Sequence, residues 1–117
     1  TRESTDTIAV GHRAIERAVA LIQSEFGRDL GVGDIARAAG VSRRMLHYLF
    51  ANELHRTPAS FLRQVRLDHA KRMLEDTDEK IATIAGECGF STSRNLHRTF
   101  IRETGMAPMR WRTSTPG

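Results

Sequence analysis

The sequence predicts an all-α protein in which two helical lobes are joined by one long helix, with about seven helices in all. Apolar residues recur at intervals of three and four, which is the spacing of one face of an α-helix, and no stretch alternates as a strand would. Glycine, proline, serine and threonine fall between the apolar stretches, where helices end and begin. Part of the first half of the chain also recurs in the second half, which indicates a duplicated unit.

The first lobe is predicted to contain three helices, over about residues 11–26, 32–39 and 43–54. The first helix is predicted to stop at Gly27 and the second at Gly40, because glycine commonly follows the end of a helix. Ser42 is a suitable N-cap for the third helix, since its hydroxyl can accept a hydrogen bond from a backbone N–H of the first turn.

The long helix is predicted to begin with Thr57 as its cap and Pro58 at its first position, where proline is favoured, and to end near Glu75. Its roughly 18 residues would span about 27 Å. Apolar residues cover more than half of its circumference, so we expect it to contact both lobes. The second lobe is then predicted to contain helices over residues 81–88, 92–103 and 108–112, with Ser91 capping the middle one.

The duplicated unit is visible as IARAAGVS, from residue 35, and IAGECGFS, from residue 84, at an offset of 49. After one inserted residue the offset becomes 50, and it matches five further identical pairs: Leu46 with Leu96, His47 with His97, Phe50 with Phe100, Glu53 with Glu103 and Pro58 with Pro108. Each copy contains a short helix, a turn at Gly40 or Gly89, and a longer capped helix. This combination is typical of a helix-turn-helix, and its occurrence twice indicates two such units.

The longer helix of each copy has a face that suits DNA. Projection at about 100° per residue turns Met45, Leu46, Leu49 and Phe50 inward on one helix, and Leu96 and Phe100 inward on the other. The opposite faces carry side chains that can reach base edges, and we interpret them as base-reading: Arg44, His47, Tyr48, Ser93, Arg94, His97 and Arg98. Side chains at the helix starts or flank are expected to contact phosphates instead: Arg43, Thr92 and Arg102.

Charge supports an anionic partner. The chain carries a formal net charge of +4, and between residues 88 and 112 five arginines accompany one acid, Glu103. A basic segment of this kind favours binding to nucleic acid. No apolar stretch approaches the roughly 18 residues of a membrane span, and the N-terminal residues lack the apolar core of a signal peptide. The single cysteine, Cys88, excludes an internal disulfide and favours a reducing cytoplasm.

Cys88 and His97 raise two chemical alternatives, which are a nucleophile with its base and a metal site completed by His47 and His55. However, Cys88 aligns with Ala39, the last inward position before the turn glycine, so we interpret it as a core residue. No pair has the spacing of metal ligands, and no carboxylate pair or phosphate loop supports an enzyme. We therefore expect no cofactor and no metal. A helical protein-interaction module that has lost DNA binding remains the alternative function.

The chain resembles the DNA-binding domain of the AraC/XylS family of bacterial transcription regulators. The resemblance covers about residues 14–112 and is carried by IARAAGVSRRMLHYLF, RTPASFLRQVRLDHAKRMLEDT and IATIAGECGFSTSRNLHRTFIRETGMAPMRWR. The base-reading positions of the family fall on the seven side chains named above. Lys80 and Ala107 depart from the family, which usually has a capping hydroxyl at both places. GVSRRML and the ECGF turn are similar to sugar-responsive, xylose-type members.

The resemblance implies a monomeric domain that inserts both recognition helices into successive major grooves of double-stranded promoter DNA. It also implies contact with RNA polymerase, mostly to activate transcription. In the family such a domain usually follows an effector-binding or dimerising N-terminal region, so TRESTDT is identified as a linker remnant. We accordingly divide the chain into linker remnant (1–10), first helix-turn-helix lobe (11–56), linker helix (57–76), second helix-turn-helix lobe (77–113) and tail (114–117).

Overall fold

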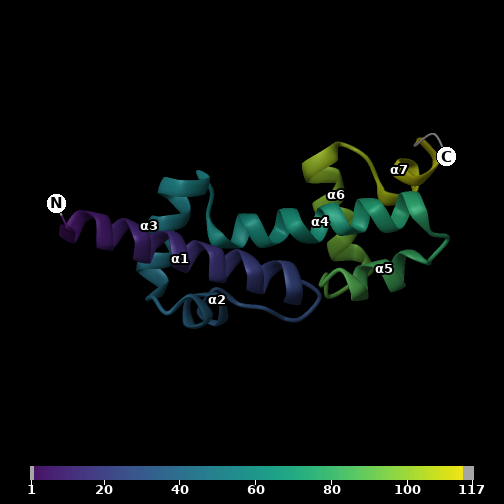
Figure 1. Ribbon diagram of the computed structural model, residues 1–117. Coiled ribbons are helices and arrows are strands. Elements are labelled where there is room, and N and C mark those ends of the chain that lie inside the picture. Colours follow the sequence, from purple (N-terminus) through teal and green to yellow (C-terminus); the bar gives the residue numbers. More distant parts are fainter. Residues whose placement is uncertain (1, 115–117) are drawn as a thin grey trace. The chain divides into compact units, whose positions relative to one another are not determined.

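The computed structural model describes the backbone of residues 2–114 and the side chains of residues 9–114, and the secondary structure in this part of the chain consists of helices joined by short connections (Figure 1). The seven helices are α1 (Arg2–Glu25), α2 (Val32–Ala39), α3 (Arg43–Leu54), α4 (Pro58–Asp76), α5 (Ile81–Glu87), α6 (Ser93–Thr104) and α7 (Pro108–Ser114). They form two compact units that divide within α4, the first holding residues up to 26 and 30–62 and the second holding 27–29 and the chain from 63 on. The predicted fold class is confirmed.

The first unit packs α1, α2 and α3 around Ile22, Ile35, Leu46 and Phe50, each of which is fully buried. Helix α1 begins at Arg2, so the prediction of a helix start near residue 11 is wrong. Neither proline nor glycine interrupts residues 2–10, and extending a packed helix costs far less than nucleating one.

Gly11, the predicted helix start, is instead a point of close approach between α1 and α3. A Cβ atom at Gly11 would lie 3.1 Å from Cδ2 of Leu49 on α3. That separation is shorter than an ordinary van der Waals contact, so glycine lets the two helices pack closely. Glycine at this position therefore marks a packing contact inside a helix, which spacing along the sequence does not distinguish from a helix end.

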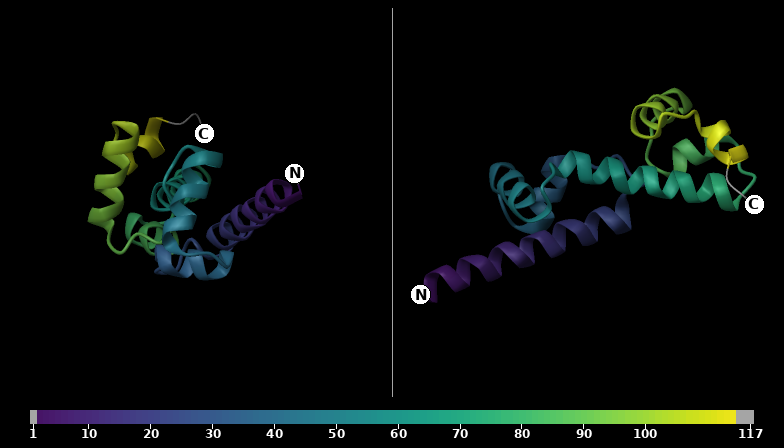
Figure 2. Two further views of the ribbon diagram at one scale, coloured as in Figure 1. Left: turned by 90° about the vertical axis from the view of Figure 1, so that its left-hand side faces the viewer. Right: turned by 90° about the horizontal axis from the view of Figure 1, so that it is seen from above.

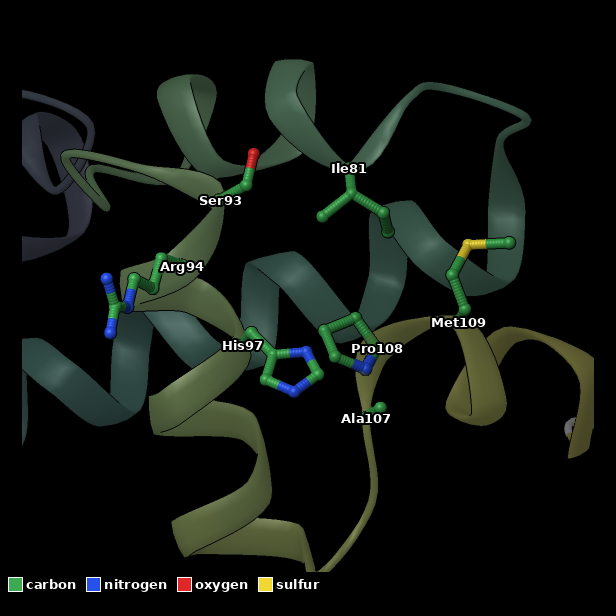
Figure 3. Close-up of a pocket in the computed structure, with 7 residues that line it drawn as sticks. All are labelled: Ile81, Ser93, Arg94, His97, Ala107, Pro108 and Met109. Atoms are coloured by element: carbon green, nitrogen blue, oxygen red, sulfur yellow. The ribbon is translucent and has the colours of Figure 1, made fainter.

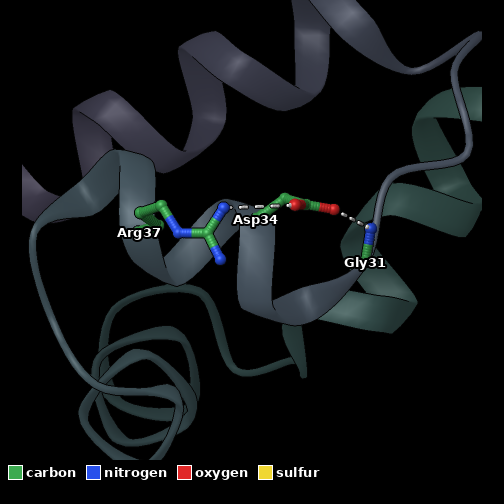
Figure 4. A network of polar contacts seen from close by, with 3 residues as sticks. All are labelled: Gly31, Asp34 and Arg37. Carbon is green, nitrogen blue, oxygen red and sulfur yellow. Dashed lines mark hydrogen bonds and ion pairs between the residues drawn. The ribbon is translucent and has the colours of Figure 1, made fainter.

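The start of α2 is closed by a short polar network in place of a side-chain hydroxyl cap. The backbone N–H of Gly31 donates to Oδ2 of Asp34 at 2.9 Å, and the other carboxylate oxygen lies 3.9 Å from Nη1 of Arg37 (Figure 4). The carboxylate satisfies an N–H of the helix start and stands where the positive end of the helix dipole favours an anion. The bond to Asp34 therefore caps α2, whereas the longer, exposed ion pair with Arg37 adds little.

The two turns are alike, with one difference that corrects the alignment of the repeats. Gly40 and Gly89 have φ values of 75° and 86°, in the left-handed region that glycine adopts without strain. The Ser42 hydroxyl accepts from the backbone N–H of Met45 at 3.1 Å, as predicted. In the second copy Thr92 makes the equivalent bond, to the N–H of Asn95 at 3.0 Å, so Ser91 is not the cap and α6 begins at Ser93. The residue inserted in the second copy therefore lies between the turn glycine and the N-cap of α6.

The second unit gathers α5, α6 and α7 about the C-terminal part of α4, as the views in Figures 1 and 2 agree. Its core comprises buried residues from α4, from the helix-turn-helix and from the connections between them: Leu67, Ala70, Leu74, Ile84, Ala85, Cys88, Phe90, Leu96 and Phe100. Helix α7 is held against α4 by Arg112, whose Nε donates to the Leu74 carbonyl at 3.0 Å and whose Nη2 donates to the Thr77 carbonyl at 2.9 Å. Polar as well as apolar contacts therefore stabilise the second unit.

Equivalent aromatic pairs occur in the two units and confirm the repeat in three dimensions. Phe50 and Phe61 meet edge to face with ring centroids 5.8 Å apart, and Phe100 and Trp111 do so at 5.7 Å. Each pair joins a recognition-helix candidate to the helix that follows it. Such geometry places the positive ring edge against the negative face of its neighbour. The same kind of aromatic contact therefore positions α3 in the first unit and α6 in the second unit.

Candidate nucleic-acid interface

Helix α6 separates an inward and an outward face. Leu96, Thr99 and Phe100 are buried, at 0%, 6% and 0% exposure. The four predicted base-reading side chains of this helix are all exposed: Ser93, Arg94, His97 and Arg98. Because residues three and four apart share a helix face, these four groups present two guanidinium groups, an imidazole and a hydroxyl to solvent together. The surface can donate several hydrogen bonds to anionic or acceptor groups.

Ile101 belongs to the same outward face and was missed by the sequence reasoning. It lies three residues after Arg98, and its side chain is 46% exposed. Helical projection places it on the arc of Arg94 and Arg98, so its position was available from spacing alone.

Helix α3 presents the corresponding face of the first unit. Arg44, His47 and Tyr48 are all exposed, and Tyr48 reaches 63% exposure. Met45, which we expected to face inward, is 45% exposed, so that prediction is wrong. Only Leu46 and Phe50 are buried on this helix, and such a narrow buried stripe leaves Met45 on its rim.

The imidazole of His47 is oriented within α3. Its Nδ1 atom lies 3.0 Å from the carbonyl oxygen of Arg43, one turn earlier. A carbonyl oxygen only accepts hydrogen bonds, so Nδ1 carries the proton in this contact. The other ring nitrogen, Nε2, is then left for a partner outside the helix.

The three predicted phosphate contacts differ in their surroundings. The Arg43 guanidinium lies against the backbone of α2, because a Cβ atom at Gly33 would stand 2.7 Å from its Nη2. The Thr92 hydroxyl already accepts the cap hydrogen bond, which leaves its O–H free to donate. Arg102 has Nε 3.6 Å from Oε1 of its neighbour Glu103, and its side chain is well exposed, so this ion pair is weak.

A groove of about 340 Å³ runs beside the N-terminal half of α6, and its lining is almost entirely apolar (Figure 3). Figure 3 shows the His97 ring turned toward Pro108, with Ile81 and Met109 beyond, while the Arg94 guanidinium points away from them. The lining comes from the N-terminal parts of α5, α6 and α7 and from the residue that precedes α7: Ile81, Ser93, Arg94, His97, Ala107, Pro108 and Met109. The groove therefore adjoins the exposed face of α6 and extends it with an apolar surface.

The chemical alternatives built on Cys88 do not fit the geometry. Cys88 is 1% exposed and its Sγ lies 3.8 Å from Sδ of Met73, whereas His97 is exposed. Burial, with a smaller contribution from Glu87, raises the pKa of the thiol to about 11 and so disfavours a nucleophilic thiolate. Among the described residues no group of three or more His, Cys, Asp and Glu side chains is arranged to hold a metal ion. Cys88 is a core residue, as its alignment with Ala39 predicted.

Comparison with known proteins agrees with this architecture. Residues 35–114 match the helix-turn-helix domain family. The chain belongs to the AraC/XylS family of helix-turn-helix domains. This AraC/XylS domain is 33% identical over 81 residues to the HTH-type transcriptional regulator Rv1931c of Mycobacterium tuberculosis, covering 69% of the chain and 31% of that protein. It is 32% identical over 113 residues to the HTH-type transcriptional activator RhaR of Klebsiella pneumoniae, covering 95% of the chain and 40% of that protein. The chain thus spans a third or so of the length of these relatives.

Solved structures superimpose on the AraC/XylS domain over most of its length. An AraC-type regulator from Chromobacterium violaceum aligns with a TM-score of 0.82 and 31% identity, over 93% of this chain and 99% of that one. The DNA-binding domain of AdpA, in a complex with target DNA, aligns with a TM-score of 0.82 and 28% identity, over 87% and 91%. In the described part of the chain no helix is both long and apolar enough to cross a membrane.

Proposed function

We propose that this AraC/XylS domain binds double-stranded promoter DNA sequence-specifically, with α3 and α6 entering successive major grooves. The observation that carries the proposal is the pair of equivalent exposed faces on two helices that follow the same turn in two copies of one unit. Arg44, Tyr48, Arg94 and Arg98 supply groups that recognise base edges or phosphates. The AdpA domain, which has the same fold, was crystallised with its target DNA.

The proposal extends to the protein of which the domain forms part. RhaR, a relative, is named a transcriptional activator, so we propose that this domain also serves activation, through contact with RNA polymerase at the promoter in the cytoplasm. Since the chain covers 40% of that relative, we further propose that an effector-binding N-terminal region works with it. In this scheme the protein acts by binding and not by catalysis, and the domain alone is a monomer.

The division into lobes and linker helix is part of the same proposal. Residues 11–56 and 77–113 would each present one recognition helix to DNA, and residues 57–76 would connect them. A helix of about 19 residues spans roughly 28 Å, which is close to the repeat of about 34 Å between major grooves on one face of a duplex.

The test is selection of binding sites from a random duplex pool, followed by footprinting and titration of the selected site. We expect a site with two protected major-groove segments and an affinity that falls steeply with salt, because bound phosphates release counterions. Replacing Arg94 or Arg98 by alanine should weaken binding to that site by about 1–3 kcal/mol and relax the preference for one base pair each. Arg13→Ala, on an exposed side chain of α1, is the matched control for loss of one positive charge. Binding that is insensitive to sequence in the wild-type domain would refute the proposal.

A further inference from the structure

Histidine can act on a base edge as donor or as acceptor, and which role it takes depends on its tautomer. A histidine whose Nε2 carries the proton reads acceptors such as guanine O6 or N7. A histidine whose Nδ1 carries the proton has an unprotonated Nε2, which accepts hydrogen bonds from donors instead. His47 and His97 occupy equivalent places in the repeat, but of these two it is His47 whose ring makes a hydrogen bond within the described part of the chain.

The contact of His47 selects one tautomer. Its Nδ1 lies 3.0 Å from the carbonyl oxygen of Arg43, within normal hydrogen-bond distance. The carbonyl has two lone pairs, so it can accept this bond in addition to the backbone bond of the helix. An unprotonated Nδ1 would instead point its lone pair at the carbonyl oxygen, which is repulsive. The neutral imidazole is therefore held with its proton on Nδ1 and with Nε2 as an acceptor.

We infer that His47, through an unprotonated Nε2, is a specificity-determining residue that selects an exocyclic amine in the major groove, either N6 of adenine or N4 of cytosine. This inference rests on the proposed function. The amines of adenine and cytosine are the only hydrogen-bond donors that base pairs present in the major groove. Guanine N7 and O6, thymine O4 and phosphate oxygens offer only acceptors to Nε2, so the neutral His47 discriminates against them.

The position of His47 suits this role. It lies on the exposed face of α3, one turn from Arg44 and adjacent to the 63%-exposed Tyr48. Its bond to Arg43 is made within the helix, so the ring is already oriented before DNA arrives. A preorganised side chain loses less conformational freedom on binding than a free one.

The first measurement needs no DNA. Two-bond ¹H–¹⁵N correlation spectra of the ¹⁵N-labelled domain at pH 8 distinguish the two tautomers of each histidine. We expect the His47 ring to show a protonated Nδ1 and an unprotonated Nε2. A predominant Nε2–H tautomer for His47 would overturn the inference without touching the proposed function.

The second measurement uses the selected binding site and the variants His47→Ala and His97→Ala. His47→Ala should relax the preference at one base pair that carries adenine or cytosine, and His97→Ala should affect a different segment of the site. At the His47 position, replacing adenine by purine or cytosine by 2-pyrimidinone removes the amine alone. Wild-type affinity should then fall roughly threefold to tenfold, as for loss of one neutral hydrogen bond, while the affinity of His47→Ala should not change.

The outcomes separate the two claims. Sequence-specific binding by the wild-type domain, together with equal sensitivity of wild type and His47→Ala to amine removal, would overturn the role of His47 and leave the proposed function standing. A preference for guanine at the position relaxed by His47→Ala would do the same. Absence of sequence-specific binding by the wild-type domain would overturn both.

Discussion

The residue after α3 provides a test of how the two copies of the unit differ in stability. His55 follows α3 with φ of 55° and ψ of 34°, in the left-handed region, and it is the single non-glycine residue with positive φ in the described part of the chain. In the second copy Gly105 takes the equivalent place after α6, with φ of 79°. Only glycine adopts this conformation without a clash between Cβ and the following carbonyl. We therefore expect His55→Gly to stabilise the domain.

The magnitude follows from two opposing effects. Left-handed backbone costs an L-residue about 1–2 kcal/mol, and replacing it with glycine removes that cost. Glycine also gains more freedom in the unfolded chain, which offsets roughly 0.5–1 kcal/mol. The net gain for His55→Gly is about 0.5–1 kcal/mol in the free energy of unfolding. The reverse change, Gly105→Ala, should cost about 1 kcal/mol.

The assay is urea unfolding followed by far-ultraviolet circular dichroism, with the free energy obtained by linear extrapolation. His55→Ala is the matched control, because it removes the imidazole but keeps the Cβ atom, and it should give no comparable gain. A free energy for His55→Gly equal to or below that of His55→Ala would refute the account based on backbone strain.

Three further predictions concern the second unit. Gly86→Ala should stabilise it by about 0.5–1 kcal/mol, because a Cβ atom on this exposed helical residue meets nothing within 4 Å. Gly27→Ala should instead destabilise it, because the added Cβ atom would lie 2.7 Å from the Glu87 carbonyl oxygen. The free energy of unfolding should fall as pH rises from about 9 to 11. The unfolded chain releases the Cys88 proton near the ordinary thiol pKa, whereas the folded chain retains it until its pKa of about 11. Urea titrations of Cys88→Ala should lack this part of the pH dependence. Arg112→Lys should lower the free energy of unfolding by about 1–3 kcal/mol, because one ammonium group cannot reproduce the two hydrogen bonds from Nε and Nη2. Full stability of this variant in thermal or urea unfolding would contradict the prediction.

Most of the fold was predictable because its signals are local. Ser42 and Thr57 cap α3 and α4 as their positions predicted, with hydroxyl bonds of 3.1 and 3.0 Å to backbone N–H groups. Arg66 has a structural role that sequence spacing does not specify, since its Nη2 donates to the Arg28 carbonyl at 2.8 Å. The ends of helices were less predictable: α4 runs to Asp76 and α7 to Ser114, beyond the predicted ends. Competing hydrogen bonds at a helix end differ by little in energy, so sequence alone specifies the last turn poorly.

The sequence by itself determined the helical class, the two copies of the helix-turn-helix and the outward faces of α3 and α6, because helical periodicity and the offsets of 49 and 50 residues are properties of the chain. Tertiary structure alone decided that Gly11 is a contact with Leu49, that Thr92 and not Ser91 caps α6, and that Met45 lies at the rim of the core. It also decided the ring orientation of His47, and hence which nitrogen faces outward. These features depend on distances between atoms that sequence spacing does not specify, such as the approach of one helix to another or of a ring nitrogen to a carbonyl oxygen.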